Sequence, residues 1–183
     1  MPVSVDWQAI EESIFANGME EFPQIAADHP NRKIYCVFFD CDLVYTCVQA
    51  HMNTEEGLRE YATDAMSRNP EIYLEHTIES LMEEFRWDGG GFRMFQISEG
   101  PDLTELGEAY EQLYDEIEIE ASAQLQEPFM EACCRAVIRL DRAGAFREFQ
   151  QRCDFRILVT YINEPVDAGE ERMQRVLNQI GKV

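Results

Sequence analysis

Apolar residues that recur every three or four positions predict the helices of this chain. The clearest stripe follows Pro101 and consists of Leu103, Leu106, Tyr110, Leu113 and Ile117. This spacing places the five side chains on one face of an α-helix. The predicted helices cover residues 5–28, 53–68, 70–85, 102–127, 129–143 and 170–180.

Three residues are expected to interrupt these helices. Gly18 and Pro23 lie inside the first stretch, where we expect a bend or a division. Pro128 is expected to separate the helix that begins near Asp102 from the one that follows it, because proline lacks the N–H that a helix interior requires.

Two apolar runs early in the chain predict a β-hairpin over residues 34–50. The first run, IYCVFF, is almost continuously apolar, which is typical of a strand covered on both faces. Residues 40–42 supply turn-forming side chains, and a second strand is expected over residues 43–50. The sequence also predicts a strand over residues 155–162 and a short one over residues 92–97.

This order of elements predicts one α+β domain over residues 1–183. Its sheet is expected to be small and mostly antiparallel, packed by about five to six helices. Hydrophobic residues make up 45% of the chain and aromatic residues 11%, which is enough to build a core.

The net charge of -21 is unevenly distributed along the chain. Residues 1–134 hold 29 acidic and 6 basic residues, whereas residues 135–183 hold 7 acidic and 9 basic residues. So negative a chain is not expected to bind nucleic acid directly or to bind an anionic membrane. It is suited to the fast, salt-sensitive capture of a basic protein.

The acidic residues around the stripe at residues 103–117 are the candidate partner-binding residues. They are Asp102, Glu105, Glu108, Glu111, Asp115 and Glu118. No Lys or Arg occurs between residues 94 and 134, so no ion pair can form within this helix. Two interpretations remain open, a solvated outer face and a surface that receives a basic partner.

The cysteine and histidine positions indicate no metal site and no cofactor site. None of the six cysteines forms a C-x-x-C pair, and His29, His51 and His76 share no metal-ligand spacing. We expect reduced, mostly buried thiols, which suits the cytoplasm. The first residues lack the pattern of a signal peptide, and no apolar run is long enough to span a membrane.

One short pattern suggests catalysis. The run FFDCDLV places Asp40 and Asp42 after an apolar strand, and it resembles the first motif of haloacid-dehalogenase-type phosphatases, which use Mg²⁺. Thr160 resembles that family's second motif. Only 23 residues follow Thr160, too few for the lysine and the later acidic pair that the family requires. A turn between strands explains both aspartates equally well.

The sequence NTEEGL at residues 53–58, with Phe85-Arg86-Trp87 after it, resembles a bacterial family called domain of unknown function 4303. The resemblance covers most of the chain, and it implies no activity and no catalytic residues. Small acidic bacterial proteins of this sort often resemble immunity proteins of toxin systems.

These observations favour a non-enzymatic binding protein, an immunity-type inhibitor that covers a basic surface of a toxin or another protein. One alternative is a Mg²⁺-dependent phosphohydrolase that uses Asp40 and Asp42. A further alternative is an adaptor or a homo-oligomer whose acidic face has no specific role.

Overall fold

The computed structural model describes residues 5–87, 95–96, 101–114, 118–161 and 164–181. The helices along these residues are α1 (Trp7–Asp28), α2 (Glu55–Arg68), α3 (Ile78–Phe85), α4 (Thr104–Tyr114), α5 (Glu118–Ala143) and α6 (Val166–Ile180). The strands are β1 (Lys33–Asp42), β2 (Cys47–Thr54), β3 (Phe95–Gln96) and β4 (Gln150–Tyr161).

The four strands form one mixed sheet in the order β3-β2-β1-β4. β1 and β2 form the predicted hairpin, and β2 also pairs antiparallel with β3. β4 lies at the other edge and runs parallel to β1. Two of the three pairings are antiparallel, so the predicted α+β class with a mostly antiparallel sheet is confirmed.

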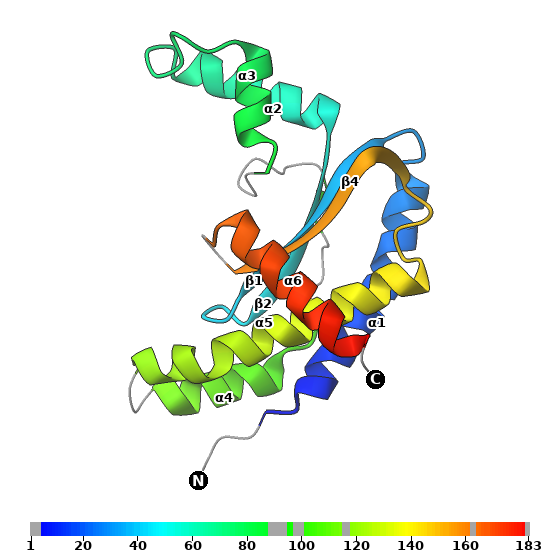
Figure 1. Ribbon diagram of the computed structural model, residues 1–183, viewed down its shortest axis with the longest axis vertical. Coiled ribbons are helices and arrows are strands. Elements are labelled where there is room, and N and C mark those ends of the chain that lie inside the picture. Colours follow the sequence, from blue (N-terminus) through cyan, green and yellow to red (C-terminus); the bar gives the residue numbers. More distant parts are fainter. Residues whose placement is uncertain (1–4, 88–94, 97–100, 115–117, 162–163, 182–183) are drawn as a thin grey trace.

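The buried strand β1 supplies both faces of the sheet with core residues. Val37, Phe39 and Cys41 belong to a large core cluster that they share with α1, α4, α5 and α6. Phe38 points to the opposite face, where it joins a smaller cluster with α2 and α3. Figure 1 accordingly shows the α2–α3 pair apart from the other four helices. This alternation explains why the first strand is almost continuously apolar.

The predicted turn at residues 40–42 is wrong in position, because these residues still belong to β1. The chain turns over residues 43–46 instead, where the N–H of Thr46 donates to the carbonyl of Leu43 at 3.2 Å. Leu43 is fully buried, and this burial favours a strand that continues through Asp42, so the chain turns only after the polar residues that suggested a turn.

The predicted helix break at Pro128 is also wrong. α5 is continuous from Glu118 to Ala143 with Pro128 inside it. An interior proline costs about 3 kcal/mol. Leu125, Phe129 and Met130 are buried on either side of it, and burying side chains of this size gains about 1.5–3 kcal/mol each. The packing of these neighbours therefore offsets the cost of the proline.

The first helix is undivided as well. α1 contains both Gly18 and Pro23. A Cβ atom at Gly18 would lie 2.7 Å from Cδ1 of Leu140, so the glycine allows α1 to approach α5 closely. None of the described helices is sufficiently long and apolar to cross a lipid bilayer.

Candidate partner-binding surface

α4 presents one apolar face to the core and one acidic face to solvent. Leu103, which precedes it, and Leu106 and Tyr110 are at most 6% exposed and belong to the large core cluster. α4 packs against α5 on this side. The predicted contact residues Asp102, Glu105, Glu108 and Glu111 are all exposed. The spacing of apolar and acidic residues therefore predicted the orientation of this helix correctly.

Two of the predicted contact residues lie outside this description. Asp115 falls outside the described residues, and Glu118 is described only as the first residue of α5, without its side chain. The surface is therefore defined by Asp102, Glu105, Glu108 and Glu111, which we call the α4 carboxylates.

Asp102 has a structural role at the start of the helix. Its carboxylate accepts hydrogen bonds from the backbone N–H of Thr104 at 3.1 Å and from the Thr104 hydroxyl at 2.7 Å. These bonds stabilise the ionised form and lower the pKa of Asp102. The helix thus begins with a fixed negative charge that also favours its positive dipole end.

Some acidic residues elsewhere in the chain are paired with arginines. Glu11 of α1 accepts hydrogen bonds from Arg135 at 2.9 Å and from Arg139 at 2.8 Å. On α6, Arg172 is only 7% exposed and donates two hydrogen bonds to Glu164. No ion pair within the described part of the chain involves an α4 carboxylate. The α4 carboxylates are therefore not neutralised by a base among the described residues.

A hollow of about 210 Å³ lies between α4 and the start of α1. Ile10, Leu103 and Leu106 give it apolar walls, and Asp102 and Glu105 add carboxylates to its lining. A lysine or arginine side chain combines an apolar stem with a charged head, so this lining matches its chemistry.

The two aspartates of the alternative catalytic pair lie in different surroundings. Asp42 is buried, and its carboxylate accepts hydrogen bonds from the backbone N–H groups of Val44 at 2.8 Å and Tyr45 at 3.1 Å. It therefore holds the hairpin turn, which is the structural role that aspartate commonly plays in turns.

Asp40 is half-buried on the same face of β1 as Phe38. Burial raises the pKa of Asp40, an effect that the nearby His51 opposes. Thr160 of β4 is its register partner across the parallel pairing. No group of three or more His, Cys, Asp and Glu residues among those described is arranged to hold a metal ion.

Two core cysteines, Cys41 and Cys134, have raised pKa values. Cys41 and Cys133 share a hydrogen bond in the core, and this bond together with burial raises the pKa of Cys41 well above its usual value. Burial raises the pKa of Cys134 to about 12. All six cysteines are free, in agreement with the expected reduced thiols. Cys41 and Cys134 are therefore poor nucleophiles, because the thiolate is the reactive form.

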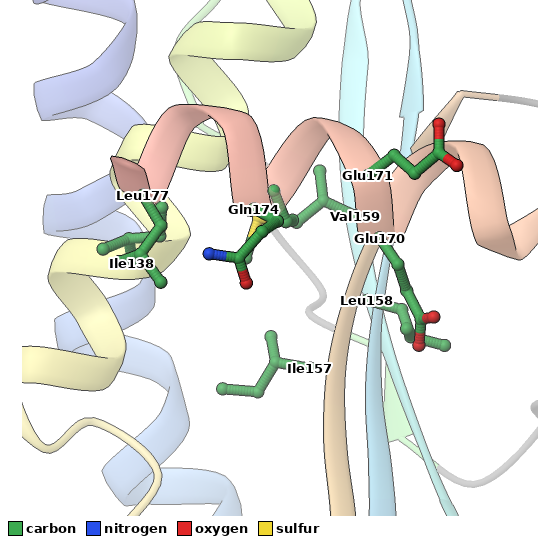
Figure 2. A pocket seen from close by; sticks show the side chains of 9 residues that line it. Ile138, Ile157, Leu158, Val159, Glu170, Glu171, Gln174 and Leu177 are labelled. Atoms are coloured by element: carbon green, nitrogen blue, oxygen red, sulfur yellow. The ribbon is translucent and has the colours of Figure 1, made fainter. Parts of the chain in front are cut away.

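A groove between β4 and α6 was not predicted from the sequence. It encloses about 480 Å³. Figure 2 shows Ile138 and Leu177 at one end of it and the carboxylates of Glu170 and Glu171 at the other. Glu170 is paired with Arg156 at 3.0 Å. The groove is formed by α5, β4 and α6. In the sequence the apolar residues of each element resemble ordinary core positions, so no local pattern predicts the groove.

Comparison with known proteins gives a family and no activity. The family described as domain of unknown function (DUF4303) matches residues 18–179, which is most of the chain. No curated protein and no solved structure matches this chain. The chain therefore belongs to the DUF4303 family, as the resemblance at residues 53–58 suggested.

Proposed function

We propose that this member of the DUF4303 family is a non-enzymatic binding protein, an immunity-type inhibitor that covers a basic surface of a toxin or another protein with its α4 carboxylates. The observation that carries the proposal is that these residues are exposed and have no ion pair within the described residues. Unpaired surface charge of one sign attracts a partner of opposite charge and accelerates association.

The unequal charge distribution supports the same proposal. No base occurs between residues 94 and 134, so neither α4 nor the first half of α5 can neutralise the α4 carboxylates. The absence of a base nearby in the sequence, and not a larger number of acids, therefore distinguishes α4.

The proposal is tested by capturing partners from a lysate of the organism that carries this chain, at low salt, followed by washes of rising salt. The variant Glu105→Lys, Glu108→Lys, Glu111→Lys is compared with Glu60→Lys, Glu71→Lys, Glu75→Lys. The second set also consists of exposed carboxylates and changes the net charge equally, but it lies on and beside α2.

We expect the unmodified protein to retain one basic protein in a stoichiometric amount. The α4 variant should release it at a much lower salt concentration, whereas the control variant should behave almost like the unmodified protein. If both variants release it alike, binding depends on total charge and not on α4. A mixture of basic proteins that elutes together would contradict the proposal.

A second candidate function, a Mg²⁺-dependent phosphohydrolase, is supported by one observation. Asp40 and Thr160 are register partners near the carboxyl ends of two adjacent parallel strands, where α/β proteins commonly bind ligands. The role of Asp42 in the turn counts against it. Mg²⁺-dependent hydrolysis of p-nitrophenyl phosphate that disappears in Asp40→Asn would support this candidate, and hydrolysis that persists in the variant would remove it.

A further inference from the structure

The turn between β1 and β2 exposes two large apolar side chains. Tyr45 is 76% exposed and Val44 is 51% exposed. Among the described residues only Ile72, Leu74 and Leu177 are other large hydrophobic residues with comparable exposure. Two neighbouring exposed side chains of this kind form a small apolar patch on one turn.

Hydrogen bonds and a buried side chain hold this turn in one conformation. The buried carboxylate of Asp42 accepts hydrogen bonds from the N–H groups of both Val44 and Tyr45. The fully buried Leu43 anchors the turn, and Thr46 closes it in the left-handed conformation, with φ of 45°. A loop that is already ordered loses little conformational entropy on binding, so its contacts contribute more to affinity.

This turn lies beside α4. A Cβ atom at Gly107 would be 3.5 Å from the hydroxyl oxygen of Thr46, which places the turn against α4 one helical turn from Glu111. Figure 1 shows the same end of the hairpin near the α4–α5 pair and far from α2 and α3. Because Tyr45 is adjacent to Thr46 in the turn, it borders the part of the α4 surface that carries Glu111.

The combination of an exposed aromatic ring and unpaired carboxylates indicates which basic side chain fits. A guanidinium group stacks on an aromatic face and also binds a carboxylate through two parallel hydrogen bonds. An ammonium group is a strongly hydrated point charge that matches this arrangement less well. The chain itself uses the first contact, since the guanidinium of Arg139 lies 4.4 Å from the ring centre of Phe15.

We propose that Tyr45, supported by Val44, is the apolar anchor of the α4 surface and that it receives an arginine side chain of the basic protein partner. The inference rests on the proposed function, because it assigns the partner to the α4 carboxylates. It adds a specific contact residue and a preference for arginine over lysine.

The test is an NMR titration of the ¹⁵N-labelled full chain with hexa-arginine amide and, separately, with hexa-lysine amide. We expect the largest shift changes at residues 43–46 and along α4, and tighter binding of hexa-arginine. Tyr45→Leu should weaken hexa-arginine binding about threefold to fivefold, as expected for the loss of one cation–π contact, and leave hexa-lysine binding nearly unchanged. Tyr45→Phe should retain the preference.

Leu74→Ala is the matched control, since Leu74 is 80% exposed and lies between Glu71 and Glu75 on the α2–α3 loop. It should not change either affinity. Two results would contradict the role of Tyr45 as anchor. One is shift changes that spread evenly over the α2–α3 loop and over residues 43–46 and α4. The other is an unaltered hexa-arginine affinity in Tyr45→Leu. In either case the capture experiment with the α4 variant still decides the proposed function independently.

Discussion

α1 and α4 both pack against α5, but they differ in what happens to their acidic residues. The carboxylates of Glu11 and Glu12 on α1 are bound by Arg135 and Arg139 of α5. α4 meets the part of α5 that follows shortly after it in the chain, where the sequence contains no Lys or Arg. Glu11 and Glu12 are therefore neutralised by arginines of α5, whereas the α4 carboxylates have no such partner among the described residues.

This difference shows that the number of acidic residues does not reveal which charges are free. Glu11 and Glu12 are part of a helix interface and contribute to folding. The α4 carboxylates gain nothing from the described fold except the hydrogen bonds at Asp102, and they repel one another along the helix. A local cost without a local benefit is what we expect of residues that serve a contact with another molecule.

The largest effect should come from removing the arginine at the α1–α5 interface. Arg139 binds Glu11 and Glu12, and its guanidinium also covers Phe15. Arg139→Met should lower the free energy of unfolding by about 1.5 kcal/mol, because it removes charged hydrogen bonds that solvent only partly screens. Chemical denaturation measures this change.

Arg142→Met is the control for that measurement. Arg142 lies on the same helix, is exposed and has no ion pair among the described residues. Its replacement should change the free energy of unfolding by less than about 0.5 kcal/mol. Equal losses in the two variants would show that the α1 carboxylates are not stabilised by pairing.

The sequence predicted the acidic surface but not the pairing that makes it distinctive. Local periodicity was sufficient to place Leu103, Leu106 and Tyr110 inside and the α4 carboxylates outside. The pairing of Glu11 with Arg135 joins residues 124 positions apart and depends on how α1 docks on α5. Such a contact arises from tertiary structure, for which one sequence offers no periodic signal.

Prediction of the fold was limited in the same way. Each strand was recognised from its apolar residues, yet the parallel pairing of β4 with β1 is a long-range feature that no turn residue indicates. Pro128 and Pro23 misled the assignment because their local cost was visible in the sequence and the compensating packing was not. The exposed apex at Tyr45 was missed because its residues were assigned to a strand.

An effect of opposite sign is expected on α4. Glu105→Gln, Glu108→Gln, Glu111→Gln should raise the free energy of unfolding by a few tenths of a kcal/mol, about 0.2–0.5 for each relieved like-charge pair at most. The gain should appear at low ionic strength and fade near 1 M salt, where the Debye length is only about 3 Å. Loss of stability in this variant would mean that the α4 carboxylates have an internal partner after all.

The smallest effect concerns His51, a histidine beside the carboxylate of Asp40. His51 is half-buried on the sheet; burial lowers its pKa, and the charge of Asp40 raises it. Because its folded pKa lies below the unfolded value of about 6.5, the unfolded state binds the proton first as the pH falls. The contribution of His51 to stability is therefore present above about pH 6.5 and is lost as the pH falls toward the folded pKa. Asp40 acts in the opposite direction, since its folded pKa is raised and the cost of its buried charge is relieved at low pH.

His51→Gln should consequently flatten the decline in stability between pH 7 and pH 5.5 by no more than a few tenths of a kcal/mol after solvent screening. NMR titration of the imidazole provides a direct measurement.

Asp40→Asn should move the pKa of His51 further down, because it removes the charge that favours the imidazolium ion and leaves the burial unchanged. An unchanged pKa in that variant would show that Asp40 does not influence His51. The carboxylates compared above would then be of two kinds only, those of α1 that arginines bind and those of α4 that face solvent.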